Sequence, residues 1–190
     1  DKSSKVNKVV YTSSSSVYGN NESCIETDVP QPLSLHATLK LANEKLVSQF
    51  CSAEDIDYTI ARVFNMYGGN DEFSIVSKII KAYKNQHSIS LINDGNAIRD
   101  FIHISDVVEA YKIILTSSDI DVVNVASGHG KSVGIILDYL HERDIEVSTS
   151  NIERDEISVS IANNAILKTM LASHYRFESV EDHVLSELQT

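Results

Sequence analysis

Side chains that could move protons lie close together near the start of the chain. A run of four serines, residues 13–16, follows a β-branched and aromatic stretch at Val9–Tyr11 that is typical of a buried strand. His36 and Lys40 are four residues apart in a predicted helix, so their side chains share one face. An imidazole transfers protons near neutral pH. Because any helix contains pairs at this spacing, the rest of the sequence must decide whether they form a site.

Five stretches, taken in order, resemble motifs of one enzyme family. They are the serine run with His36 and Lys40, then Arg62–Gly68, Gly95–Asp106, Asn124–Gly128 and Arg154–Asp155. The family is the NAD-dependent epimerase/dehydratase family of extended short-chain dehydrogenase/reductases, and the resemblance is closest to UDP-glucose 4-epimerase-like enzymes that act on nucleoside-diphosphate (NDP) sugars. The motifs span nearly all 190 residues. The resemblance implies the C-terminal portion of such an enzyme.

The resemblance also implies catalytic residues. In the family a serine hydroxyl bonds a sugar oxygen, a Tyr takes the hydroxyl proton, and a Lys holds the nicotinamide ribose and lowers the Tyr pKa. The matching positions here are Ser14, His36 and Lys40, with His36 in place of the Tyr. Imidazole nitrogens lie closer to the backbone than a phenol oxygen. Since proton transfer requires hydrogen-bond reach, we expect an impaired active site.

Binding residues follow from the same motifs. The resemblance implies that Ser13, Lys40 and Phe64 contact NAD. It implies that an NDP-sugar, which we expect to carry UDP, contacts the residues Ser14, Asn65, Arg99 and Arg154. A planar guanidinium is suited to a diphosphate. The alternative for each arginine is a surface salt bridge.

The family's glycine-rich cofactor loop has no counterpart ahead of the serine run. The one other candidate, Gly128–Gly134, has Val133 where the dinucleotide fingerprint requires Gly. A turn between a strand and a helix is the preferred interpretation of that segment. We therefore expect the chain to lack most of the cofactor half and to be inactive alone.

The residues after the catalytic hydroxyl favour one subgroup. The family's 4,6-dehydratases have an acidic pair there, whereas this chain has Ser15 and Ser16. This favours a 4-epimerase that works through a 4-keto intermediate. An NDP-4-keto-sugar reductase and a non-catalytic binding or assembly remnant remain as alternatives, and the motifs do not choose the sugar or the base.

Composition limits the partners. A net charge of −11 argues against nucleic acid and against an anionic membrane surface. Cys24 and Cys51 are far apart, with no His at metal spacing, so the sequence predicts no metal site and no disulfide framework. No apolar run approaches the ~18 residues that span a bilayer, so we expect a cytoplasmic protein. The family resemblance also suggests a homodimer through the helix of His36 and Lys40.

Alternating elements predict the fold class, α/β. We expect the C-terminal part of a Rossmann-like doubly wound parallel sheet, residues 1–66, and a small α/β NDP-sugar-binding domain, residues 67–190, whose chain returns to the first sheet near 119–128. The predicted strands are 9–11, 58–63, 89–92, 122–125 and 146–149. The predicted helices are 34–50, 74–83, 105–115, 132–140, 164–171 and 179–188.

Overall fold

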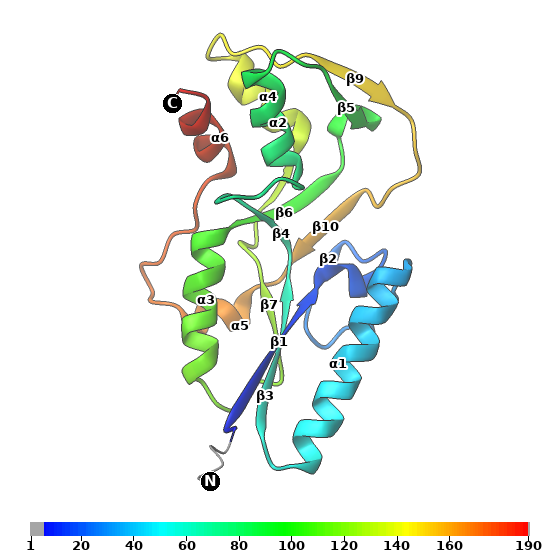
Figure 1. The fold of residues 1–190 in the computed structure, drawn as a ribbon, viewed down its shortest axis with the longest axis vertical. Helices are drawn as coiled ribbons and strands as arrows, with labels where there is room; N and C mark the ends of the chain where they lie inside the picture. Colours follow the sequence, from blue (N-terminus) through cyan, green and yellow to red (C-terminus); the bar gives the residue numbers. More distant parts are fainter. Residues whose placement is uncertain (1–5, 190) are drawn as a thin grey trace.

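The fold consists of two α/β parts that follow one another along the long axis of the molecule (Figure 1). The structure is a computed structural model, and it describes residues 6–189. In the part that contains the N-terminus, three parallel strands pair in the order β1-β3-β7. These strands are β1 (Lys8–Ser14), β3 (Asp57–Val63) and β7 (Val122–Val125).

Helices cover both faces of this three-stranded sheet. α1 lies on one face, and α3 and α5 lie on the other (Figure 1). Their bounds are Leu35–Ala53 for α1, Ile104–Thr116 for α3 and Ala165–Met170 for α5. β3 is the central strand of the three, and its residues 59–62 are buried because helices cover both faces of the sheet.

The second part is built on a mixed sheet with the order β2-β10-β6-β4, in which β8 pairs antiparallel with β6. A separate parallel pair, β5 with β9, lies at the far end. The strands are β2 (Ser23–Cys24), β4 (Asn65–Tyr67), β5 (Ile89–Ile92), β6 (Ile98–His103), β8 (Gly130–Ser132), β9 (Thr149–Ile152) and β10 (Val159–Ala162).

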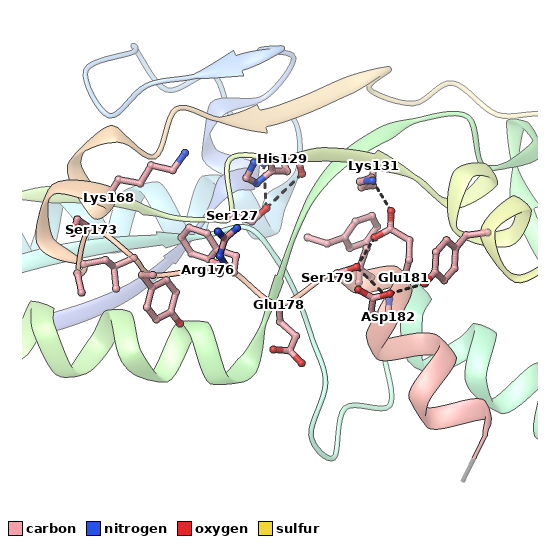
Figure 2. Close-up of a pocket in the computed structure, with 17 residues that line it drawn as sticks. Ser127, His129, Lys131, Lys168, Ser173, Arg176, Glu178, Ser179, Glu181 and Asp182 are labelled. Carbon is pink, nitrogen blue, oxygen red and sulfur yellow. Dashed lines mark hydrogen bonds and ion pairs between the residues drawn. The ribbon is translucent and has the colours of Figure 1, made fainter.

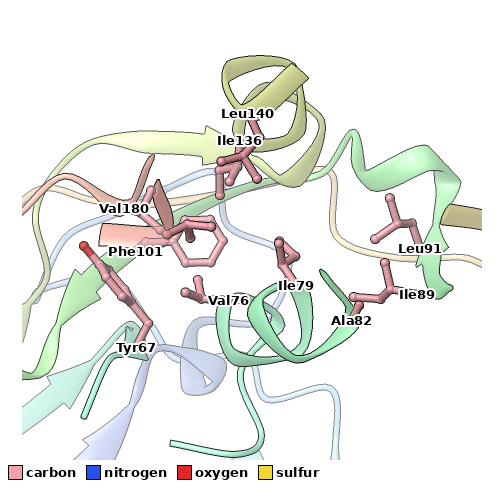
Figure 3. Packing of buried hydrophobic residues seen from close by; sticks show 11 residues of the cluster. Tyr67, Val76, Ile79, Ala82, Ile89, Leu91, Phe101, Ile136, Leu140 and Val180 are labelled. Atoms are coloured by element: carbon pink, nitrogen blue, oxygen red, sulfur yellow. The ribbon is translucent and has the colours of Figure 1, made fainter. Parts of the chain in front are cut away.

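Three helices enclose the apolar core of the second part. Side chains from α2, α4 and α6 meet those of β5 and β6, with Val76, Ile79, Phe101 and Ile136 among the buried residues (Figure 3). These helices are α2 (Ile75–Lys84), α4 (Val133–His141) and α6 (Val180–Leu188). Among the described residues, no helix is both long and apolar enough to cross a membrane.

Serine caps explain why four helices begin where they do. In each case the hydroxyl oxygen accepts a hydrogen bond from the backbone N–H three residues later, which satisfies one of the free donors of the first turn. The capping residues are Ser34, Ser74, Ser132 and Ser179. These caps and the apolar periodicity confirm the predicted helices to within a few residues at each end.

The α/β fold class is confirmed, but the strand prediction was incomplete. The predicted strand at 146–149 is wrong, because β9 begins only at Thr149, and its side chains are all exposed, so no apolar pattern marks it. β2, β4, β6, β8 and β10 were not predicted. β7 joins the first sheet within the predicted return at 119–128. Since α3 and α5 pack on that sheet too, the division at residue 66 stays a prediction.

A buried carboxylate explains how β6 tolerates charged residues. Asp100 is fully buried and accepts hydrogen bonds from the backbone N–H groups of Ser127, Gly128 and Ala162 and from the Ser127 hydroxyl, at 2.7–3.2 Å. Burial raises the pKa of Asp100, and these hydrogen bonds oppose the increase. One side chain thereby joins β6, β10 and the loop after β7.

We predict that Asp100→Ala lowers the free energy of unfolding by about 3 kcal/mol or more, because buried donors lose their acceptor. Urea denaturation measures the change. Asp138→Ala, at an exposed position of α4, should stay within about 0.5 kcal/mol of the unchanged protein. Equal effects of the two substitutions would contradict the anchoring role of Asp100.

Candidate active site

The structure brings Lys40 to the carboxyl-terminal end of β1, next to the serine run. Lys40 Nζ donates a hydrogen bond to the Thr12 carbonyl oxygen at 2.9 Å and lies 5.4 Å from the centre of the Tyr11 ring. Ser14 is the last residue of β1, and its Oγ accepts from the Ser16 backbone N–H at 3.2 Å and from the Ser16 hydroxyl at 2.9 Å. A hydroxyl and an ammonium group therefore lie at the same end of the strand.

His36 lies on the first turn of α1, one turn before Lys40. Its side chain is exposed. Within residues 6–189, no hydrogen bond, ion pair or ring contact of the imidazole is found. The residue at this position is thus free to face a ligand and does not support the helix.

A buried ion pair fixes the helix that carries Lys40. Glu44, one turn after Lys40, accepts hydrogen bonds from Arg62 of β3, with Nε–Oε1 at 3.1 Å and Nη2–Oε2 at 2.8 Å. The two side chains are only 7% and 5% exposed. The hydroxyl of Ser13 also donates to Glu44. This bidentate contact joins α1 to two strands of the sheet.

An aromatic residue completes the network. The Arg62 guanidinium lies 4.7 Å from the centre of the Tyr18 ring, and the Tyr18 hydroxyl donates to Asn124 Oδ1 at 2.6 Å. Burial raises the pKa of Tyr18 to about 12, although Arg62 opposes this. Burial therefore favours the neutral phenol at Tyr18, and the Asn124 contact holds its hydroxyl inside the protein.

The two other residues predicted to contact NAD face the interior. Ser13 is buried and directed at Glu44. Phe64 is 4% exposed, and its ring centre lies 6.3 Å from that of Tyr18 at a tilt of 36°. Since both side chains are buried, their contact with NAD stays a prediction.

Asn65 and Arg99 share a cavity of about 430 Å³ in the second part. Asn65 Nδ2 donates to the Asp100 carbonyl oxygen at 2.9 Å. Arg99 donates to Glu156 at 3.1 Å and to the Ile98 carbonyl oxygen at 2.9 Å. Burial lowers the pKa of Arg99, and Glu156 opposes the decrease. The cavity thus presents an oriented amide and a half-buried cation.

Arg154 does not line this cavity. It lies at a neighbouring polar hollow, and Glu156 contributes to both. The Arg154 backbone is held by the Asn93 side chain through two hydrogen bonds of 2.7 and 3.1 Å. Of the four residues predicted to bind the substrate, the structure therefore groups Asn65 with Arg99, and leaves Ser14 and Arg154 elsewhere.

The glycine-rich segment 128–134 is a packing element. It contains β8, and α4 begins within it at Val133. A Cβ on Gly130 would lie 2.5 Å from an Ile161 side-chain carbon, so the backbone at Gly130 packs closely against β10. Among the described residues, no group of three or more His, Cys, Asp or Glu side chains could hold a metal ion.

Sequence reasoning missed Glu44 as a residue of the site. A signal existed, since Glu44 follows Lys40 by four residues on the same helix face. The other signal was Arg62, a charge in an otherwise apolar strand, which requires a buried partner.

The parallel strands covered by helices on both faces define an α/β protein. The sequence matches the model of the NAD dependent epimerase/dehydratase family over residues 2–126. The chain belongs to this NAD-dependent family, which confirms the predicted membership.

Named relatives agree with this assignment. The chain is 36% identical over 110 residues to protein CapI of Staphylococcus aureus, a match that spans 55% of this chain and 33% of CapI. It is 32% identical over 146 residues to a putative UDP-glucose 4-epimerase of Methanocaldococcus jannaschii, spanning 72% of this chain and 47% of that protein. The chain thus spans less than half the length of these relatives.

A solved structure shows the same fold. MoeE5 in complex with UDP-glucuronic acid and NAD superposes with a TM-score of 0.86 at 26% identity. The match covers 97% of this chain and 64% of MoeE5. Rossmann-like architecture, as predicted from the sequence, is therefore confirmed.

We predict that Glu44→Ala destabilises the fold by about 3–5 kcal/mol, because it leaves Arg62 buried without a counter-charge. Urea unfolding measures the loss. The double variant Glu44→Leu/Arg62→Met should be less destabilised than Glu44→Ala alone, since it buries no charge. If the double variant instead loses the sum of the two single effects, the ion pair is not the dominant contact.

Proposed function

We propose that this chain is the NDP-sugar-binding and catalytic-helix portion of an NAD-dependent NDP-sugar 4-epimerase. The observation that carries the proposal is the cavity shared by Asn65 and Arg99, in a chain whose Lys40 lies at the end of β1. Solved relatives of the family hold a UDP-sugar and NAD. A UDP-linked sugar is the substrate class that this combination favours.

NAD, when bound, would accept a hydride from the sugar ring and return it. The residues of this chain fit such a cofactor in part. Lys40 offers an exposed ammonium group anchored on Thr12, suited to a ribose hydroxyl. Ser14 offers a hydroxyl at the strand end for the sugar oxygen. The donors for the cofactor pyrophosphate would come from outside the segment 128–134, because Ile98 and Ile161 pack closely against Gly130.

His36 is the proposed proton-transfer position. Its exposed imidazole extends less far than a phenol, so we propose that proton transfer is impaired, and that the chain is inactive alone because it lacks the glycine-rich NAD loop. Ser15 and Ser16 supply no carboxyl group for removing water, which favours epimerisation over dehydration. An NDP-4-keto-sugar reductase would use the same residues, and a non-catalytic binding module would need only the cavity of Asn65 and Arg99.

A homodimer through α1 is part of the proposal. Exposed apolar side chains follow one another along this helix, and a partner would remove them from water. They are Leu35, Leu39, Leu46 and Phe50, with exposures of 55–77%.

We predict that Arg99→Gln weakens binding of UDP by about 1.5–3 kcal/mol, the usual contribution of a hydrogen bond to a charged group. Isothermal titration calorimetry of the 190-residue chain measures the affinity. Arg143→Gln is the matched control, because Arg143 contacts Glu142 and Tyr139 away from the cavity. Equal affinity in both variants, with circular dichroism unchanged, would make Arg99 a structural partner of Glu156 only.

We predict that His36→Tyr raises the rate of epimerisation roughly a hundredfold, the contribution expected of a well-placed general base. The assay uses the chain fused to the glycine-rich cofactor half of an epimerase of the family. It measures the interconversion of UDP-glucose and UDP-galactose first, and then that of the N-acetylated pair.

Lys40→Met in the fusion that carries His36→Tyr should remove the gain, since the cation favours the ionised phenol. A His36→Tyr fusion that binds NAD and sugar nucleotide but reacts no faster would favour the binding-module alternative.

A further inference from the structure

A second and larger cavity, of about 760 Å³, lies where the two parts of the molecule meet. Its walls are the loop after β7, β8, the end of α5, the connecting segment 171–179 and the start of α6 (Figure 2). Phe101 is the only residue that it shares with the cavity of Asn65 and Arg99. The two cavities therefore present separate sets of polar groups.

Two of the three carboxylates that line the cavity have partners within the protein, whereas the third, the exposed Glu178, forms no ion pair among the described residues. Glu181 forms an ion pair with Lys131 at 2.5 Å and accepts from the Ser179 hydroxyl at 3.1 Å. Asp182 accepts from the Tyr139 hydroxyl at 2.6 Å. Since Glu181 and Asp182 have these partners, their half of the cavity offers little to a ligand.

The opposite half holds two cationic side chains and an imidazole, all three of them exposed. Lys168, Arg176 and His129 lie around it, and Arg176 points toward His129 in Figure 2. Among the described residues, no carboxylate lies within ion-pair distance of Lys168 or Arg176. The chain as a whole carries a net charge of −11, yet two cations without an ion-pair partner among the described residues line one side of this cavity.

An apolar wall lies beside these cations. Leu171 is 7% exposed, and the half-buried Phe177 packs edge to face with Tyr175, with ring centres 5.3 Å apart. The Tyr175 hydroxyl donates a hydrogen bond to Asp106 Oδ1 at 2.6 Å. This wall can pack against carbon but can accept few further hydrogen bonds.

We propose that this cavity binds a small organic phosphate. A guanidinium fork, an ammonium group and an imidazole together supply more donors than the two oxygens of a carboxylate need, and they match the three free oxygens of a phosphate monoester. The volume falls in the range of small-molecule sites and exceeds what an inorganic ion fills. The apolar wall would hold the organic group.

Phenyl phosphate is the probe, because it carries both features. Titrated into the ¹⁵N-labelled 190-residue chain, it should shift the backbone amide resonances of 127–131 and 172–179. Inorganic phosphate should shift the same amides with about tenfold weaker affinity, and phenol should leave them in place. These resonances are distinct from those of 90–99, which would report binding at the Arg99 cavity.

Lys168→Gln/Arg176→Gln should weaken phenyl phosphate binding at least about tenfold. The matched control is Lys45→Gln/Lys84→Gln, which removes two exposed cations of α1 and α2 and should leave the affinity within about twofold. Dispersed spectra of all variants establish that the fold is intact. The proposal is overturned if phenyl phosphate at ~10 mM shifts none of these amides, or if both double variants lose affinity equally.

Discussion

The ion pair between Glu44 and Arg62 is the contact on which the rest of the candidate active site depends. It joins α1 to β3 at the centre of the sheet, and through the Ser13 hydroxyl it also holds β1. A bidentate geometry allows little rotation of the helix. The buried Glu44–Arg62 contact therefore positions Lys40, one turn earlier, at the end of β1, and no ligand is needed for this.

Asp100 has the corresponding role in the second part. Its carboxylate gathers N–H groups from β10 and from the loop after β7, while its backbone carbonyl receives the Asn65 amide. Arg99, the preceding residue, points to the other face of the strand, as the alternation of side chains requires. One buried acid thus orients the amide and the arginine of the smaller cavity, and it also fixes Ser127 on the wall of the larger one.

Local signals made the helices and the serine run predictable, whereas long-range pairing was not. Ser34, Ser74, Ser132 and Ser179 each start a helix through a contact three residues away, which a sequence displays directly. β6 and β10 were missed because the charges or polar residues they contain are satisfied by partners far along the chain, as Asp100 is by Ala162. Family motifs supplied the candidate residues of the site, but no motif shows that Arg154 lies at a different hollow from Arg99, where Asn93 holds the Arg154 backbone.

Residue 36 stands apart from these dependencies. The buried pair holds α1 at its third turn, and the Ser34 cap holds its start through Ala37. The exposed His36 side chain contributes to neither contact. A change of side chain there alters chemistry without altering the position of Lys40 or Ser14. The contacts that hold α1 in place do not include residue 36, the proposed proton-transfer position. The same fold is therefore compatible with either an enzyme or a binding module.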